Sequence, residues 1–241
     1  MTTIIKDETL TAIGDAIREK TGKTNKLTPA EMVTEIAGIT TSGGEDPLGL
    51  MMTQKLDTYT NTDITDDLQV AINVRELHLP NCTQVPSNCF NGKAESMEKI
   101  ILAGINDTSK DNINRQFGYC YALKKLPALG KTTYIGDENF YSCTSLVNDF
   151  YKLKRPLVKL GIGCFRQCTS FGSTCSKLFI DDTITTIDAV AFYRTNLTDI
   201  YTPFSERPSG WRGNAFEESV TIHYGVTEAE FDEILAAEGT V

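Results

Sequence analysis

The sequence predicts a solenoid, in which short repeat units stack into a coil. Two observations carry this prediction. Six phenylalanines recur at spacings of 27, 23, 25, 27 and 24 residues, and the residue five positions before each is apolar in five of the six copies. A period in the twenties indicates units that bury an apolar face against their neighbours. We expect the six rings to stack in an interior ladder made of Phe90, Phe117, Phe140, Phe165, Phe192 and Phe216.

The best-formed copy of the unit spans residues 135–146 and reads IGDENFYSCTSL. It resembles the pattern Ile-Gly-x-x-Ala-Phe-x-x-Cys-x-x-Leu of BspA-like leucine-rich repeats, with Asn139 in the alanine position. The resemblance covers about residues 70–225. It implies a leucine-rich-repeat solenoid of short parallel strands with turns and short helical segments, which we place at residues 51–225. The strands are expected at 76–79, 99–102, 125–127, 149–151, 177–180, 199–201 and 221–224.

Both ends of the solenoid have distinct sequence signals. Residues 48–73 hold scattered apolar residues among many Thr and Asp, which indicates either an N-terminal cap or a worn first repeat. At the other end, residues 226–241 are expected to form a capping helix over the last repeat. Thr227 and Glu230 form a capping-box pattern, Phe231 and Leu235 supply an apolar face, and Gly239 ends the helix.

The N-terminal segment predicts a helical hairpin at residues 1–41, followed by a flexible linker at 42–50. Leu10, Ile13 and Ile17 lie on one helical face, and the stretch from Thr28 to Glu31 has the pattern that opens a second helix. This hairpin is similar to one in tail-associated proteins from phages and prophages of Gram-positive bacteria. The resemblance implies a virion context, with residues 1–41 docking to tail or baseplate proteins.

Charge and composition exclude several function classes. The formal charge of −9 argues against nucleic-acid binding, which needs clustered Lys and Arg. The sequence has no apolar run of about 18 residues, so no membrane span is expected. Its start lacks the pattern of a secretory signal, so we expect assembly in the bacterial cytoplasm. The seven cysteines mostly follow the repeat register, which favours buried thiols over disulfides.

The sequence predicts no catalytic, cofactor-binding or metal-binding residue, and hence no cofactor. The two histidines, His78 and His223, fall in the first and last strand sets and cannot share one centre. Cys164, Cys168 and Cys175 lack the spacing of a zinc site, and core packing accounts for the first two. Acidic pairs at 181–182 and 217–218 flank turns, where solvated carboxylates are ordinary.

Tyrosines are the best candidates for ligand contact, because they offer apolar area and a hydroxyl together. Tyr141 and Tyr193 both follow an anchor phenylalanine directly, so they should project on the same side from different repeats. Tyr151 and Tyr201 lie beside the repeats. The alternative is that all four simply pack against neighbouring repeats.

Together these observations predict a non-enzymatic structural or binding protein of a phage or prophage tail or baseplate, located in the virion. Its repeat domain would contact a host-surface glycan or protein, or a neighbouring virion subunit. The alternative is a bacterial cell-surface adhesin or interaction module of the BspA type. A glycan-cleaving enzyme is a third class, which no converging acid and base support. The sequence leaves open the ligand, the host and whether the chain forms a homo-oligomer.

Overall fold

The computed structural model describes residues 53–65, 68, 74–105, 113–147 and 151–239, together with Gly14, Asp15, Arg18 and Thr28. The chain divides into two units, Met1–Thr53 and Gln54–Val241. Gly14, Asp15 and Arg18 are helical. The rest of the predicted hairpin, apart from Thr28, and the linker at 42–50 lie outside the described residues. No helix in the described part of the chain is long and apolar enough to cross a membrane.

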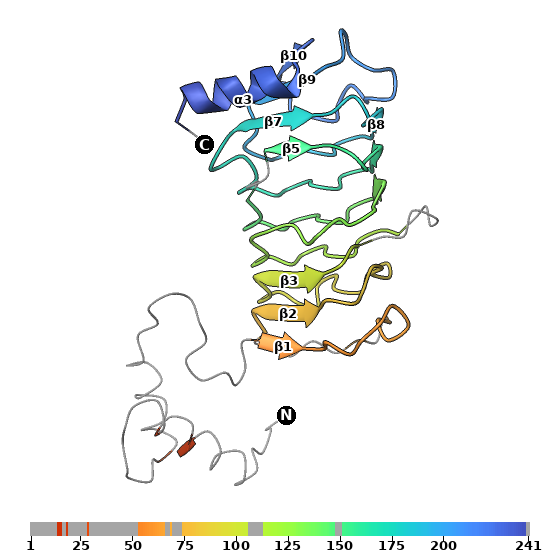
Figure 1. Ribbon diagram of the computed structural model, residues 1–241, viewed down its shortest axis with the longest axis vertical. Helices are drawn as coiled ribbons and strands as arrows, with labels where there is room; N and C mark the ends of the chain where they lie inside the picture. The colour runs from red at the N-terminus through yellow and green to blue at the C-terminus, as the bar shows by residue number, and fades with distance from the viewer. Residues whose placement is uncertain are drawn as a thin grey trace. The chain divides into compact units, whose positions relative to one another are not determined.

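The second unit is a solenoid of stacked, parallel strands, as the sequence predicts (Figure 1). Strands β2 and β3 pair in parallel, as do β5 with β7, β7 with β9 and β9 with β10. The strand orders are β1-β2-β3 and β10-β9-β7-β5. Their bounds are Thr53–Lys55 (β1), Glu76–Leu79 (β2), Lys99–Leu102 (β3), Lys152–Leu153 (β5), Lys177–Ile180 (β7), Asp199–Thr202 (β9) and Thr221–Tyr224 (β10).

A second flank of the coil carries a sheet that the sequence analysis missed. Strands β4 (Tyr134–Ile135), β6 (Lys159–Leu160) and β8 (Thr186–Ile187) pair in parallel in the order β4-β6-β8. An isolated bridge between Ile187 and Trp211 extends the row. The second residue of each strand is buried and is the apolar residue five positions before an anchor phenylalanine. That sequence position therefore marks a short strand rather than only a core contact.

The six anchor phenylalanines form a continuous interior column. Ring centroids along Phe90, Phe117, Phe140, Phe165, Phe192 and Phe216 are 5.4, 5.2, 5.4, 5.3 and 5.3 Å apart, and all five pairs are stacked. Backbone hydrogen bonds hold the repeats in step. The amide of Phe140, for example, donates to the carbonyl of Cys164 in the next repeat at 2.8 Å. Each turn of the coil, called a rung below, thus repeats the same local geometry.

The cysteines support this column, and the prediction of buried thiols is confirmed. All seven lie in the described part of the chain as buried thiols without disulfides. Cys143 donates from Sγ to the carbonyl of Phe117 at 3.1 Å, and Cys168 does the same to Phe140 at 3.0 Å. The thiol is small enough for the interior and still satisfies a buried carbonyl of the preceding rung.

Two predicted strands need correction. Residues 125–127 do not form a strand, because Pro127 has no backbone N–H to donate to a ladder. The ladder of strands is therefore interrupted, and β3 and β5 belong to different sheets. The strand expected at 149–151 begins later, at Lys152, and residues 148–150 lie outside the described part.

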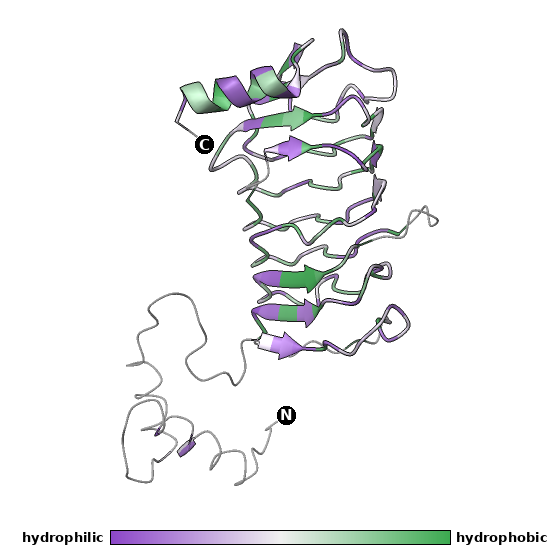
Figure 2. Cartoon of the chain, viewed as in Figure 1, coloured by the Kyte–Doolittle hydropathy of each residue, from purple (hydrophilic) through white to green (hydrophobic). Residues whose placement is uncertain are grey.

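Helix α3 (Glu228–Ala237) begins at the predicted capping box, in which the Thr227 side chain accepts from the Glu230 amide and the Glu230 carboxylate accepts from the Thr227 amide. Its position differs from the prediction. Phe231 and Leu235 pack on Phe179 of β7 and Tyr201 of β9. These strand residues point away from the phenylalanine column, so α3 lies across the outer face of the sheet rather than over the last rung (Figures 1 and 2).

Ion pairs fix α3 to the sheet. The ammonium of Lys152 lies 2.9 Å from Glu228 and 2.6 Å from Asp232, and that of Lys154 lies 2.8 Å from Glu228. Burial alone would lower the pKa of Lys152, but its hydrogen bonds to Asp232 and Glu228 outweigh this and raise it. Hydrogen bonds from Lys154 and Lys152 hold the pKa of Glu228 below its ordinary value.

Acid is expected to weaken the attachment of α3. Because the pKa of Glu228 is lower in the folded state, its contribution is present above the unfolded pKa of about 4.3 and is lost as pH falls through the folded pKa. Glu228 is partly exposed, so we expect less than about 1 kcal/mol from it. Unfolding measured by circular dichroism between about pH 7 and pH 3 checks this. Glu228→Gln should flatten the pH dependence, whereas Glu233→Gln on the same helix should not; equal curves would contradict the assignment.

Candidate functional site

The most distinctive surface is a row of aromatic and guanidinium side chains, which we call the tyrosine–arginine strip. Three members directly follow an anchor phenylalanine in successive rungs, so the stacked column places them in line. The other three lie one or three positions further along the chain. The strip crosses the four rungs anchored by Phe117 to Phe192 and consists of Tyr119, Tyr121, Tyr141, Arg166, Tyr193 and Arg194.

Each member of the strip contacts the next. The ring centroid of Tyr119 lies 6.0 Å from that of Tyr121 and 5.1 Å from that of Tyr141, edge-to-face in both cases. The guanidinium of Arg166 lies 5.6 Å from the ring centroid of Tyr141 and 5.9 Å from that of Tyr193. Arg194 lies 5.5 Å from the ring centroid of Tyr193. The two predicted contacts Tyr141 and Tyr193 therefore meet at an arginine that lies between them.

The strip is exposed to solvent at the end formed by Tyr119 and Tyr121, and Arg166 in its middle is more buried. Tyr119 is 38% exposed and Tyr121 is 40% exposed, which is unusual for rings of this size in this fold. Arg166 is half-buried, and its Nε atom is buried without a hydrogen-bond partner among the residues that the structure describes. Burial, and then Tyr141, raise the pKa of Tyr119, so its hydroxyl stays neutral at physiological pH.

The other two predicted contacts lie elsewhere. Tyr201 is only 7% exposed, because Phe231 of α3 covers its ring at a centroid distance of 5.2 Å. Tyr151 packs partly against the same cluster. Both residues therefore pack in the cluster that holds α3, and neither belongs to the strip. Tyr201 lies within β9 and Tyr151 directly before β5, whereas Tyr141 and Tyr193 follow an anchor phenylalanine.

The residues considered for catalysis have structural partners. His78 pairs with Glu76 on β2, and His223 pairs with Asp199 across β10 and β9, each at 2.7 Å. Burial raises the pKa of the Cys143 and Cys164 thiols far above the ordinary value, which disfavours a nucleophilic thiolate. Among the described residues, no three His, Cys, Asp or Glu side chains are placed to hold a metal ion.

The acidic pairs at 181–182 and 217–218 also act in turns. Asp181 accepts from the backbone amide of Thr183 at 2.9 Å, and Glu217 accepts from that of Arg194 at 2.8 Å. Asp181 therefore caps its own turn, whereas Glu217 joins its rung to the preceding one, and neither carboxylate converges with a general base.

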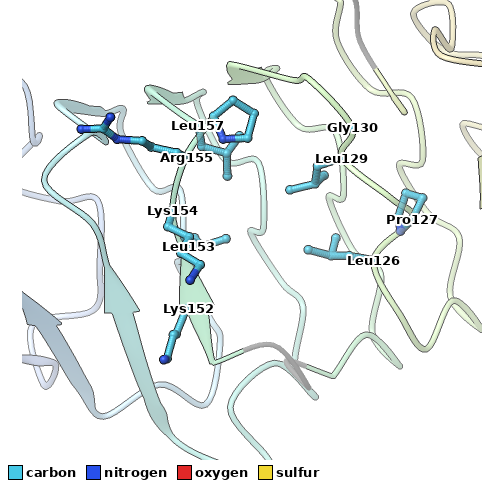
Figure 3. Close-up of a pocket in the computed structure, with 10 residues that line it drawn as sticks. Leu126, Pro127, Leu129, Gly130, Lys152, Leu153, Lys154, Arg155 and Leu157 are labelled. Atoms are coloured by element: carbon cyan, nitrogen blue, oxygen red, sulfur yellow. The ribbon is translucent and has the colours of Figure 1, made fainter. Parts of the chain in front are cut away.

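A hollow of about 370 Å³ lies where the strand ladder is interrupted (Figure 3). Leu126 and Leu129 of the irregular rung face Leu153 and Leu157 of the next. Lys152 and Lys154 at its rim are committed to α3. Its ten described lining residues include no carboxylate, histidine or cysteine, and three of them are cationic, namely Lys152, Lys154 and Arg155. Because both lysines are paired with carboxylates of α3, the lining does not bring an acid and a base together.

The contacts predicted from the sequence do not include Arg166, Arg194, Tyr119 or Tyr121. The signal for Arg166 was present, because it occupies the same position after its phenylalanine as Tyr141 and Tyr193 do after theirs. The residues that directly follow the anchor phenylalanines form one column, so their shared position, rather than their residue type, indicates Arg166 as a contact.

Comparison with known proteins gives one match. The family model for the BspA type leucine-rich repeat region matches residues 83–223, in six copies. This range covers more than half of the chain and includes the whole tyrosine–arginine strip. No curated protein and no solved structure matches the chain.

Proposed function

The chain belongs to the BspA-type leucine-rich repeat family, and on this premise we propose that it is a non-enzymatic interaction module that binds a macromolecular ligand along the tyrosine–arginine strip. The observation that carries the proposal is the contiguous strip itself. Tyrosine and arginine are, with tryptophan, the residues enriched among those that dominate binding energy at interfaces. A rigid repeat frame holds them in line, so little conformational entropy is lost when a ligand binds.

We further propose that the module works in a phage or prophage tail or baseplate. The support is the resemblance of residues 10–32 to the tail-associated hairpin, through which residues 1–41 would dock to the particle. Many copies on one particle would convert weak individual sites into strong avidity. Neighbouring tail genes would favour this setting, and an operon of surface proteins would contradict it. The alternative setting, a bacterial cell-surface adhesin, is compatible with the family.

Binding should depend on the exposed tyrosines of the strip. The paired substitution Tyr119→Ser and Tyr121→Ser removes two exposed rings and should leave the column intact. We expect about a tenfold or greater loss of affinity for a ligand found by screening host envelope glycans and proteins. The matched control is Tyr224→Ala on β10, outside the strip, which should bind like the wild type. Equal binding by the paired variant, or a screen without any ligand, would contradict the proposed site.

A further inference from the structure

Within the part of the chain that the structure describes, the guanidinium groups of Arg166 and Arg194 form no ion pair. Both contact the ring of Tyr193, and Arg166 also contacts that of Tyr141. Glu217 is the carboxylate at this end of the strip, and it accepts from the backbone amide of Arg194.

Other arginines of the solenoid differ from these two. Arg75 pairs with Glu98, Arg115 with Glu138 and Arg212 with Asp188. Arg155 and Arg207 form no ion pair among the described residues, but neither contacts an aromatic ring there. Two guanidinium groups gathered on one tyrosine of a chain whose formal charge is −9 favour an anion from another molecule as their partner.

Arg166 is the better prepared of the two. Tyr141 and Tyr193 hold its guanidinium at 5.6 and 5.9 Å from their ring centroids. The group is planar and offers a fork of N–H donors that matches a carboxylate. Its buried Nε lacks a partner within the described residues, so the side chain already bears a desolvation cost in the absence of ligand. Ligand binding then requires little further ordering.

The repeat distance of the strip distinguishes between two kinds of polymer. Successive rungs are 5.2–5.4 Å apart at the phenylalanine column. An extended peptide advances about 3.3 Å per residue, so side chains on one face recur about every 6.6 Å, out of step with the rungs. One sugar unit of an extended β-1,4-linked polysaccharide has a length close to one rung. A polysaccharide along the strip could therefore meet Tyr141, Arg166 and Tyr193 with three successive sugars.

From these observations we infer that the strip binds a carboxylate-bearing polysaccharide, with a carboxylate on the Arg166 guanidinium and the flanking sugars against the edges and hydroxyls of Tyr141 and Tyr193. The inference rests on the proposed function, whose site it shares, and adds the chemical class of the ligand. Salt should weaken such binding, because the arginines are partly exposed.

The test is a calorimetric titration of the full chain with polymannuronate, a β-1,4-linked polymer with one carboxylate on each sugar. Wild-type protein should bind polymannuronate, and it should bind the fully methyl-esterified polymer, which lacks the charge, about tenfold or more weakly. Poly-glutamate, which carries carboxylates on a peptide, should also bind more weakly. Equal binding of the methyl ester or of poly-glutamate, or no binding of polymannuronate, would overturn the inference.

Variants assign the effect to the arginines. Arg166→Gln and the exposed Arg194→Gln should each weaken binding of polymannuronate by about tenfold, whereas Arg166→Lys should lose less. Arg75→Gln, outside the strip, is the control and should bind like the wild type. Unchanged affinity in both Gln variants would overturn the inference. If those variants also keep binding a neutral ligand that the Tyr119 and Tyr121 substitutions abolish, only the ligand class is wrong and the proposed function stands.

Discussion

Replacing Phe140 with alanine is expected to lower the free energy of unfolding by about 3–5 kcal/mol. The Phe140 side chain is 0% exposed, and its ring stacks on Phe117 at 5.2 Å and on Phe165 at 5.4 Å. The substitution would leave a cavity in the middle of the column, and the rungs on either side are fixed by backbone hydrogen bonds, so they cannot close it. The loss should therefore be near the full cost of a buried aromatic truncation.

Urea unfolding followed by circular dichroism measures this loss, and Phe216→Ala provides the comparison. Phe216 ends the column, is 6% exposed and stacks on one anchor ring, that of Phe192. A terminal unit of a solenoid contacts a neighbour on one side, so its truncation should cost less than that of Phe140. Equal losses at the two positions, or a smaller loss at Phe140, would show that the column is not the central source of stability.

Features that depend on short stretches of sequence could be predicted. The spacing of phenylalanines located the column, the recurring cysteines located buried thiols, and the pattern around Thr227 located the start of α3. Each is a repeated or local signal whose physical reason is visible in the sequence itself. Tyr141 and Tyr193 follow the same logic, because their position after the anchor phenylalanine fixed their common side.

Features that depend on contacts between distant segments could not be predicted in the same way. The strands β4, β6 and β8 have two residues each, too few to show the alternation that marks a strand. The docking of α3 depends on Phe179 and Tyr201, which belong to separate rungs and become one apolar patch only when β7 and β9 pair. The placement of Arg166 between two tyrosines likewise requires three rungs in register.

The second large effect is expected at Gln116, which lies directly before Phe117 and is 0% exposed. Its Nε2 donates to the carbonyls of Val85 at 2.5 Å and Ile105 at 2.8 Å, and its Oε1 accepts from Nδ2 of Asn139 at 2.6 Å. Gln116→Ala would remove all three buried hydrogen bonds. The Ile105 carbonyl would keep the Val85 amide as a donor, so two groups, the Val85 carbonyl and the Asn139 Nδ2, are left without this partner. Each buried polar group left without a partner costs about 1–3 kcal/mol, so we expect a loss of at least about 2 kcal/mol.

A double-mutant cycle with Asn139→Ala distinguishes the loss of this hydrogen-bond network from the loss of side-chain volume. In Gln116→Ala the amide of Asn139 stays buried without its acceptor, so removing that amide as well should recover part of the loss. The expected interaction energy is about 1 kcal/mol or more, measured by urea unfolding of the two single variants and the double variant. Alanine fits this position, since Ala191 and Ala215 occupy it in later rungs. Strict additivity would show that the two amides do not act as a unit.

The position of the network explains why the core contains amides at all. The segment at 106–112 lengthens this repeat and separates Ile105 from Gln116 in the sequence. Ile105 is the last described residue before that segment. Four of the six anchor phenylalanines follow Cys or Ala, and Gln116 and Asn139 take this position in the other two. These two amides bond to each other, and the Gln116 side chain also reaches the carbonyls of Val85 and Ile105, which joins this rung to the preceding one. Removing the Gln116 side chain should therefore destabilise this rung more than truncating an apolar side chain of similar size.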